Sequence, residues 1–469
     1  MKLNELFPNL YILGIKTNSK EVLPGDVFVC ISGAKVDRHD FIDEAIRNGA
    51  IGLITKKDVD TSVPYVKVDN PDDIIEDLYK DFYNNPQDKL RIIGVTGTDG
   101  KTTTTTIIQA LIGDDLCGYI GTNGYSCSKF KKDTNNTTPG IEKLYMYLDE
   151  FVKAGCKYVA METSSEAFYY KRLKGIEFEV GAYTNIDSEH LNTHKTLENY
   201  IDCKKQLFRQ SKTYSILNSN DKHYKDVLDA CKKPLTYGYL DTDTLYIKDY
   251  RILPNKTDIT LVYNNETYNI SSPLLGKFNI ENLSCALLTC LSMGFKFEDL
   301  IKNLDKIYVD GRMQAINLGQ DFYCVVDYAH TPNGLIRLFE FINSLDVNKI
   351  ITVMGQAGER DPFKRKVVGE LLLNNSDHAI LTYEDPRSED INSIIDMMLE
   401  NVKDYDNYER IIDRHDAIVR AIEIAESNDI VLILGKGNET YEKLKDGTIY
   451  FNDVQEAIEA IKARMNKEE

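Results

Sequence analysis

Residues 91–112 combine a short apolar run, a glycine-rich segment and a helix-like stretch, RIIGV, TGTDG and KTTTTTIIQALI. This order predicts a strand, a loop and a helix whose first backbone N–H groups are unpaired. Those N–H groups and the helix dipole favour phosphate oxygens, and glycines let the backbone approach a ligand closely. Lys101 can reach the β- and γ-phosphates of a nucleotide, and the Thr102 hydroxyl can bind Mg²⁺. A glycine turn that only caps a helix is the alternative, because Val95 stands where the strict phosphate-loop rule has its first glycine.

The length and composition limit the class of protein. A chain of 469 residues suggests about three domains, and 42% hydrophobic with 28% charged residues is typical of a soluble globular protein. No apolar stretch reaches the roughly 20 residues of a membrane span, and no leader-like N-terminus is present, so we expect a cytoplasmic protein without stable membrane insertion. Nine scattered cysteines fit reduced core thiols. The net charge of −18 argues against nucleic-acid binding and requires a local positive site for any anionic substrate.

Strand and helix patterns divide the chain into three predicted α/β domains. Residues 1–88 mix short strands and helices. Residues 89–309 alternate strands and helices as in a parallel sheet with crossover helices, with an antiparallel excursion at 243–270 that turns at Asn264-Asn265. Residues 310–469 repeat the strand–helix alternation and predict a Rossmann-like, doubly wound domain.

The segment G-T-D-G-K-T-T at 97–103 resembles the ATP loop of the Mur ligases and the folylpolyglutamate synthetases. Further segments extend the resemblance along the whole chain: NTTPG (136–140), METSSEAF (161–168), TNIDSEHLNTH (184–194), YIDCK (200–204), GKFNIENL (276–283), GRMQ (311–314), VDYAHTP (326–332) and GKGNETY (435–441). Together with the N-terminal stretch 17–46, they identify the chain as a member of the Mur ligase family that is most similar to its MurE type. One such segment is a weak signal, whereas nine in order are a strong one.

The resemblance implies an ATP-dependent amide ligase with three domains: a UDP-sugar-binding domain, a central ATPase domain and an amino-acid-binding domain. In this family a carboxylate of the UDP-N-acetylmuramoyl dipeptide attacks the γ-phosphate of ATP, and an amine then attacks the resulting acyl phosphate. The products are an amide, ADP and phosphate, and the pathway is peptidoglycan precursor synthesis. We expect this chain to be a monomer that uses Mg²⁺ and ATP, binds the UDP-N-acetylmuramoyl dipeptide and a diamino acid, and binds no nucleic acid.

The resemblance also assigns the catalytic and metal-binding residues. Lys101 acts on the γ-phosphate, Thr102 and Glu162 hold one Mg²⁺, and His190 holds a second. Lys204 matches the lysine that carries a carbamate and so becomes an anionic ligand, with Lys205 as the competing assignment. For Glu162, a helix-capping or surface role is the alternative.

Two substrate sites follow from the same resemblance. The ATP site takes the loop residues and four residues further along the chain: Gly97, Thr98, Asp99, Gly100, Lys101, Thr102, Thr103, Asn282, Arg312, Asp327 and His330. For Arg312, a linker salt bridge is the alternative. The UDP-muramoyl acceptor site takes Ser19, Thr137, Thr138, Ser164 and Arg172. Glu166 and Tyr170 differ from the family pattern beside this site, where His and Gln are usual.

The incoming diamino acid is assigned to Arg360, Asp385, Arg387, Gly435 and Glu439. The planar guanidinium of Arg387 suits the extra carboxylate of meso-diaminopimelate, which we favour, whereas Asp385 would also suit the terminal ammonium of L-lysine. A surface salt bridge of Arg387 with Glu384 or Glu389 is the alternative. Two other functions stay open, namely a related ligase with a different acceptor and a non-ligase nucleotide switch. The N-terminal segment argues against a folylpolyglutamate synthetase, since that family lacks a UDP-sugar module.

Overall fold

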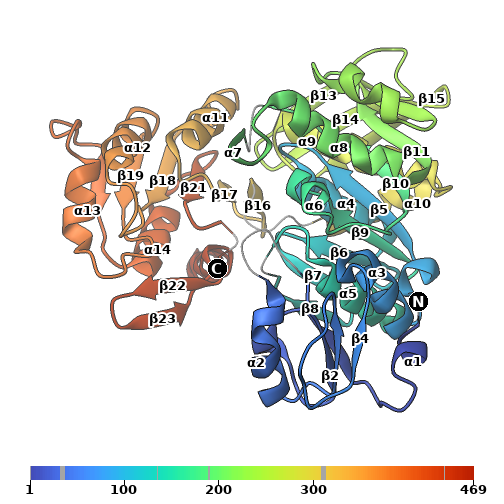
Figure 1. The fold of residues 1–469 in the computed structure, drawn as a ribbon. Helices are drawn as coiled ribbons and strands as arrows, with labels where there is room; N and C mark the ends of the chain where they lie inside the picture. Colours follow the sequence, from blue (N-terminus) through green and yellow to red (C-terminus); the bar gives the residue numbers. More distant parts are fainter. Residues whose placement is uncertain are drawn as a thin grey trace. The chain divides into compact units, whose positions relative to one another are not determined.

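The structure is a computed structural model that describes residues 2–31, 37–134, 136–187, 191–307, 313–437 and 439–468 (Figure 1). The chain divides into two compact units. The first contains residues 1–238 and 285–300, and the second contains residues 239–284 and 301–469. The limits expected from the sequence, 88/89 and 309/310, stay predictions.

The N-terminal part of the first unit is a parallel sheet with the order β1-β2-β3-β4. Alternating side chains bury both of its faces: Val27, Val29 and Ile54 pack with Leu78, while Phe28 packs on the opposite side. Its strands are β1 (Gly14–Lys16), β2 (Asp26–Val29), β3 (Gly52–Thr55) and β4 (Tyr65–Lys67). Its helices are α1 (Leu3–Leu6), α2 (Ile42–Arg47) and α3 (Pro71–Phe82), with 3₁₀ turns η1 (Ser19–Glu21) and η2 (Arg38–Phe41).

The central part of the first unit has the strand order β12-β11-β10-β5-β9-β6-β7-β8, and its strands from β12 to β6 are parallel. Strand β5 is flanked by β9 and β10, so the segments that follow these three strands meet at one edge of the sheet. The strands are β5 (Arg91–Thr96), β6 (Cys117–Gly121), β7 (Gly124–Cys127), β8 (Phe130–Lys132), β9 (Tyr158–Glu162), β10 (Phe178–Tyr183), β11 (Ser211–Asn218) and β12 (Pro234–Gly238). The helices are α4 (Lys101–Ile112), α5 (Ile141–Ala154), α6 (Ser165–Tyr169), α7 (Leu191–His194) and α8 (Leu197–Arg209), with η3 (Pro86–Lys89) and η4 (Tyr224–Ala230).

The second unit contains the expected antiparallel excursion, formed by β13 (Leu245–Leu253), β14 (Lys256–Tyr263) and β15 (Glu266–Ser272). The turn between β14 and β15 is at Asn264 and Asn265, whose φ angles are 50° and 65°, as the sequence predicts for a tight hairpin. Helix α9 (Lys277–Ser292) contains the boundary between the units, and α10 (Phe297–Ile301) and η5 (Leu304–Lys306) follow it.

The C-terminal sheet has the order β16-β17-β21-β18-β19-β20, and its strands are parallel except for β16. One face packs against α11–α13 and the other against α14 and α15, so the doubly wound prediction is confirmed (Figure 1). The strands are β16 (Gln314–Ile316), β17 (Tyr323–Asp327), β18 (Ile350–Met354), β19 (His378–Leu381), β20 (Tyr408–Arg410) and β21 (Ile430–Leu434), with a hairpin of β22 (Tyr441–Leu444) and β23 (Gly447–Tyr450). The helices are α11 (Pro332–Ile342), α12 (Phe363–Asn374), α13 (Ile391–Met398), α14 (Arg414–Ile424) and α15 (Asp453–Glu468).

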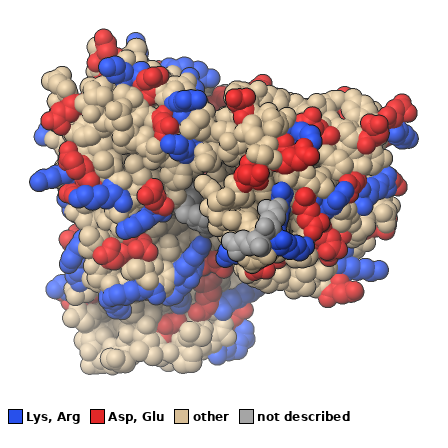
Figure 2. Space-filling view, turned by 180° about the vertical axis from the view of Figure 1, so that it is seen from behind, with Lys and Arg blue, Asp and Glu red and all other residues tan. Residues whose placement is uncertain are grey.

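In the described part of the chain, no helix has the length and apolar character needed to cross a membrane. Figure 2 shows acidic and basic side chains interspersed on the face that it presents. With a net charge of −18, a site for anions therefore depends on a few cations placed close together.

Candidate active site

The loop between β5 and α4 is shaped by residues that follow β10. Thr98 N–H donates to the Asn185 carbonyl at 2.8 Å, and Asp99 N–H donates to the Asn185 side chain at 2.9 Å. Gly97 passes so close to β10 that a Cβ there would lie 1.8 Å from Thr184 Oγ1. Gly100 has a φ of 79° directly before α4, a conformation that glycine adopts without strain. The loop therefore has the glycine-dependent shape of a phosphate site at the start of a helix.

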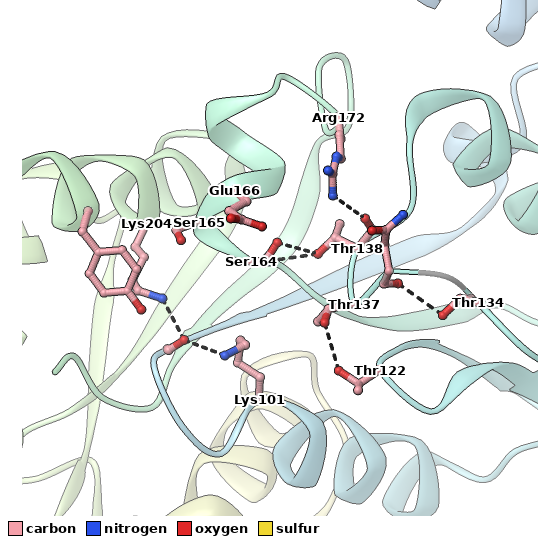
Figure 3. A pocket seen from close by; sticks show the side chains of 13 residues that line it. Lys101, Thr122, Thr134, Thr137, Thr138, Ser164, Ser165, Glu166, Arg172 and Lys204 are labelled. Carbon is pink, nitrogen blue, oxygen red and sulfur yellow. Dashed lines mark hydrogen bonds between the residues drawn. The ribbon is translucent and has the colours of Figure 1, made fainter. Parts of the chain in front are cut away.

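Lys101 lies over this loop. Its Nζ donates to the Gly97 carbonyl at 2.9 Å (Figure 3). It also donates to the Thr98 carbonyl at 2.7 Å. The ammonium group of Lys101 is thus held at the loop where the γ-phosphate is expected.

Thr104 and Thr105, further along α4, are fully buried, which indicates that these threonines have a packing role.

Glu162 ends β9 beside the start of α4 and is fully buried, so it is not a surface acid. Its carboxylate accepts hydrogen bonds from Thr102 Oγ1 at 3.0 Å, Tyr119 Oη at 2.7 Å and Thr122 N–H at 2.9 Å. A Cβ on Gly121 would lie 2.1 Å from Glu162 Oε1, so this glycine makes room for the carboxylate. The sequence did not reveal Tyr119, Gly121 and Thr122, because their position depends on β6 pairing with β9.

Lys204 and Lys205 point in different directions from α8. Lys204 is 1% exposed, its Nζ donates to the Gly97 carbonyl at 2.7 Å, and it lies 4.4 Å from the centre of the Tyr200 ring. Lys205 instead forms an ion pair with Asp229 at 2.7 Å. Only the first of these two lysines therefore faces the phosphate loop, as expected for Lys204. A carbamate on Lys204 stays a prediction.

A cavity of about 370 Å³ opens beside the phosphate loop (Figure 3). Three of its lining residues are cationic, Lys101, Lys204 and Arg172, and one is acidic, Glu166. The remaining lining residues are mostly small and polar: Gly97, Thr122, Thr134, Asn136, Thr137, Thr138, Ser164, Ser165 and Tyr200. The excess of positive charge suits an anionic substrate with many hydrogen-bonding groups.

Hydrogen bonds fix the acceptor side of this cavity. Thr138 Oγ1 donates to the Glu162 carbonyl at 2.8 Å and accepts from Ser164 N–H at 3.0 Å. Arg172 donates to the Thr138 carbonyl at 3.2 Å, and its guanidinium lies 5.5 Å from the centre of the Tyr170 ring. Four predicted acceptor residues, Thr137, Thr138, Ser164 and Arg172, thus line the same cavity as Lys101 and Lys204.

Ser19 does not line this cavity. It is buried in the N-terminal part, where its hydroxyl donates to Glu44 Oε2 at 2.5 Å. Its predicted contact with the UDP group stays a prediction.

The other predicted ATP residues lie in the second unit or outside the described residues. Asn282 is buried on α9, where its amide donates to Asn279 Oδ1 at 3.1 Å. Asp327, at the end of β17, accepts from the backbone N–H groups of residues 313 and 329, both at 2.8 Å. His330 Nδ1 lies 2.8 Å from the Tyr328 carbonyl. Arg312, the remaining predicted ATP residue, and His190, the predicted ligand of a second Mg²⁺, lie outside the described residues.

In the second unit, Lys436 joins two residues of the predicted amino-acid site. Its fully buried ammonium donates to Asp385 Oδ1 at 2.9 Å and to Glu439 Oε2 at 3.2 Å. Burial acts to lower the pKa of Lys436, but Asp385 and Glu439 outweigh it, so this pKa lies above its usual value. The carboxylate of Asp385, which would suit the terminal ammonium of a lysine substrate, is therefore already paired with Lys436, whose single charge it shares with Glu439.

Two further carboxyl groups, those of Glu384 and Glu442, are buried near this site, and Arg414 and Lys436 act on both of them. Burial raises the pKa of Glu384 and of Glu442 to about 7 in each case, and Arg414 opposes the rise. Arg414 is itself engaged by Asp453 in a bidentate pair with N–O distances of 2.8 and 2.7 Å. Gly435 has a φ of 110°, and a Cβ on it would lie 2.2 Å from Glu384 Oε2.

Arg387 and Arg360 lie on the two loops that follow β19 and β18. Arg387 donates to the Gly358 carbonyl at 2.5 Å, while Glu389, one of its two expected alternative partners, is held by Arg365. Arg360 is exposed on the loop before α12. Of the five residues predicted for the diamino acid, Asp385 and Glu439 contact Lys436 and Gly435 directly precedes it, while Arg360 and Arg387 lie on these two loops.

Comparisons with known proteins agree with this arrangement. The family model of the Mur ligase middle domain matches residues 95–290, that of the Mur ligase glutamate ligase domain matches residues 311–437, and that of the Mur ligase family catalytic domain matches residues 11–83.

Sequence matches to individual relatives cover nearly the whole chain. The chain is 35% identical to the UDP-N-acetylmuramoyl-L-alanyl-D-glutamate–2,6-diaminopimelate ligase of Bacillus cereus, over 98% of this chain and 96% of the relative. It is 34% identical to ligase 1 of the same name from Clostridium acetobutylicum, over 97% of this chain and 95% of the relative.

Solved structures show the same fold. A structure of a UDP-N-acetylmuramoyl-L-alanyl-D-glutamate–2,6-diaminopimelate ligase has a TM-score of 0.76 and 30% identity, and the match covers 99% of both chains. The MurF ligase of Thermotoga maritima in complex with ADP, at 20% identity and a TM-score of 0.60, shares the fold. The chain belongs to the Mur ligase family and has the three domains of that family.

Proposed function

We propose that this chain is an ATP-dependent ligase that joins a diamino acid to UDP-N-acetylmuramoyl-L-alanyl-D-glutamate in peptidoglycan precursor synthesis. The observation that carries the proposal is the cavity in which the phosphate-loop Lys101 meets Lys204, Arg172 and the hydroxyl groups of Thr137 and Thr138. Relatives at 34–35% identity over nearly the full length are named for this reaction.

The chemistry explains why the cationic side chains of Lys101 and Arg172 converge there, whereas Lys204, once carbamylated, would act as an anionic metal ligand. An acceptor carboxylate oxygen attacks the γ-phosphorus of ATP, the bond to the bridging oxygen breaks, and ADP leaves. The amine nitrogen then attacks the acyl carbon, loses a proton and displaces phosphate. Both first reactants are anions, so their approach needs positive charge that stays in place during the reaction. Lys101 and the N–H groups at the start of α4 serve the phosphate, while Arg172 serves the acceptor.

Magnesium fits the donor set at the start of α4. The Thr102 hydroxyl and the Glu162 carboxylate are hard oxygen ligands 3.0 Å apart, and Tyr119 and Thr122 hold the carboxylate in place. Within the described ranges, no cluster of three or more His, Cys, Asp or Glu side chains could hold a metal alone. A site with few protein ligands suits Mg²⁺, which keeps waters and shares substrate phosphates. When bound, it would neutralise phosphate charge. His190 and a carbamate on Lys204 are the proposed ligands of a second ion.

We propose meso-diaminopimelate as the incoming amine, with L-lysine as the alternative. The names of the relatives support this choice. Arg387 offers a planar fork to the distal carboxylate, Arg360 would bind the other carboxylate, and Glu439 with Gly435 would face an amino group. Lys436 is already paired with Asp385. We therefore expect the carboxylate of Asp385 to attract the terminal ammonium of L-lysine less strongly than an unpaired carboxylate would.

The test is ADP release by the purified protein with ATP, the UDP-muramoyl dipeptide and either diaminopimelate or lysine. The proposal predicts that release needs both the acceptor and an amine, and that diaminopimelate is used faster. ADP release that is independent of the acceptor would contradict the ligase and favour a nucleotide switch. Faster turnover with lysine would overturn the choice of amine alone.

A further inference from the structure

Two loops of the second unit carry the predicted diamino-acid residues in an unusual backbone conformation. They are residues 357–361, after β18, and residues 384–390, after β19. Glu359, Asp385 and Arg387 have φ angles of 55°, 43° and 52°, in the left-handed region that side chains disfavour. Such a conformation is stable only where neighbouring groups hold it, and residues that adopt it are common at functional sites.

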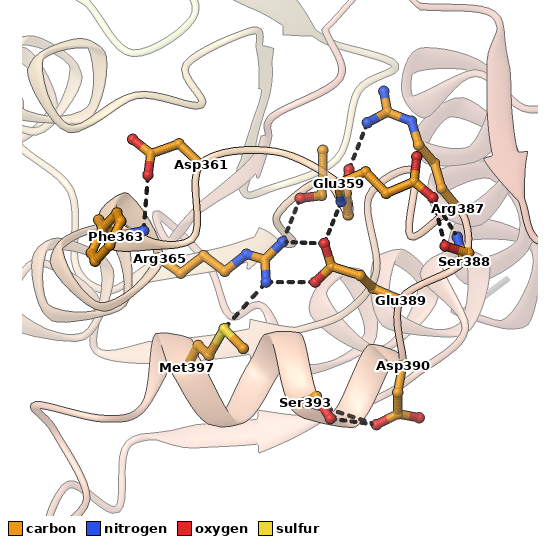
Figure 4. Close-up of polar contacts among 12 residues, drawn as sticks. Glu359, Asp361, Phe363, Arg365, Arg387, Ser388, Glu389, Asp390, Ser393 and Met397 are labelled. Atoms are coloured by element: carbon orange, nitrogen blue, oxygen red, sulfur yellow. Dashed lines mark hydrogen bonds and ion pairs between the residues drawn. The ribbon is translucent and has the colours of Figure 1, made fainter.

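One buried guanidinium bonds to both loops (Figure 4). Arg365, in the first turn of α12, has a side chain that is 1% exposed. Its two terminal nitrogens form a bidentate pair with Glu389, at 2.8 and 3.2 Å. One of these nitrogens also donates to the Ala357 carbonyl at 3.0 Å. The planar fork of arginine can make these bonds at once, whereas a lysine ammonium is a single point of charge.

Further bonds connect the loops around this pair (Figure 4). Glu359 N–H donates to the Glu389 carboxylate, and Ser388 Oγ donates to Glu359 Oε1 at 2.6 Å. Arg387 donates to the Gly358 carbonyl at 2.5 Å. A Cβ on Gly358 would lie 2.0 Å from the carbonyl oxygen of residue 386, so the backbones are in close contact. The hydrogen bonds from Arg365 lower the pKa of Glu389, which keeps the pair charged at neutral pH.

We propose that Arg365 and Glu389 are a positioning pair that sets the affinity for the incoming diamino acid without touching it. The pair joins the loop of Arg360 to the loop of Asp385 and Arg387, and so holds these three side chains in the geometry that one substrate requires. The inference rests on the proposed function. It assigns no part in phosphate transfer to the pair.

The experiment compares Arg365→Lys, Glu389→Gln and the double variant with the wild type in the ligase assay. Each single variant loses charge-assisted hydrogen bonds of this pair. We therefore expect its KM for diaminopimelate to rise about 10-fold or more. We expect KM for ATP and for the UDP-muramoyl dipeptide to change by less than KM for diaminopimelate, because Arg365 and Glu389 bond to the two loops that carry the diamino-acid residues. The KM of the double variant for diaminopimelate should be no higher than that of the more impaired single variant, since both changes break the same pair. Glu389→Gln keeps the side-chain volume at a partly exposed position, so it provides a folded variant.

Arg420 and Glu409 give a matched control. They also form a bidentate pair, with Nε–Oε2 and NH2–Oε1 distances of 3.1 and 2.9 Å, on α14 and β20. Arg420→Lys and Glu409→Gln should leave all three KM values unchanged. Equal rises in the three KM values of the Arg365 and Glu389 variants, or a lower melting temperature with unchanged KM for diaminopimelate, would overturn the positioning role. A wild type without acceptor-dependent turnover would instead contradict the proposed function.

Discussion

Glu442 offers a test of how the buried charges behind the diamino-acid loops are balanced. This residue lies on β22 with 0% exposure, and Arg414 and the Tyr383 hydroxyl act to lower the pKa of its carboxyl group against the effect of burial. Burial raises its pKa from an ordinary value of 4.5 to about 7. At about 1.4 kcal/mol for each tenfold change in proton affinity, ionised Glu442 costs the folded state about 3 kcal/mol.

The direction of the pH dependence follows from this raised pKa. The folded state binds the proton more tightly than the unfolded state, so the cost is absent below about pH 4.5, grows between pH 4.5 and 7, and is constant above. Glu442→Gln removes the titrating group. The variant should therefore gain stability relative to the wild type as pH rises through this window, by about 3 kcal/mol in total. The amide has its own cost in this buried position, but that cost does not change with pH.

Thermal melting of both proteins from pH 4.5 to 8.5 measures this difference. At roughly 2–4 °C per kcal/mol for a domain of 150–250 residues, the melting temperature of the variant should rise by about 6–12 °C relative to the wild type across the window. Glu384 is present in both proteins, so the comparison isolates Glu442. Glu409→Gln is a flat control, because Arg420 lowers the pKa of Glu409 below its usual 4.5, so its contribution is lost only at lower pH and should not change across this window. A difference between wild type and Glu442→Gln that is independent of pH would refute the reasoning.

Four substitutions test the proposed chemistry. Lys101→Ala should abolish ligation without unfolding the protein, because it removes the ammonium at the phosphate loop, and near-normal turnover of a folded variant would argue against a phosphate site. Lys204→Ala should lose activity that acetate or formate partly restores, whereas Lys205→Ala should remain active since Lys205 pairs with Asp229; the reverse pattern would shift the carbamate to Lys205. Arg387→Ala should lower kcat/KM for diaminopimelate by about 10- to 100-fold and change lysine use little, as expected for a lost charged hydrogen bond. Equal losses for both amines would mean that Arg387 only shapes its loop.

The sequence predicts those parts of the fold whose signals are local. The strand, glycine loop and helix at β5 and α4, the Asn264-Asn265 turn and the doubly wound C-terminal sheet are all present in the structure. The hairpins β7–β8 and β22–β23 were missed, because their strands have three or four residues each and show little apolar alternation.

The supporting residues of the site depend on contacts between distant segments. Glu162 could be found from its place after an apolar strand, but Tyr119 and Thr122 reach it only because β6 pairs with β9. Likewise, Arg365 and Lys436 are 24 and 51 residues away from the carboxylates that they hold, Glu389 and Asp385. Nothing in the local pattern indicates such partners.

The central claim is that an acceptor carboxylate is phosphorylated by ATP and then converted to an amide. An acceptor labelled with ¹⁸O in its reacting carboxylate, incubated with ATP and diaminopimelate, tests this claim directly by mass spectrometry of the products. We expect phosphate that carries one labelled oxygen from the acceptor, formed in equal amount to an amide product that keeps the other. Unlabelled phosphate, or labelled phosphate without an amide of the diamino acid, would contradict it.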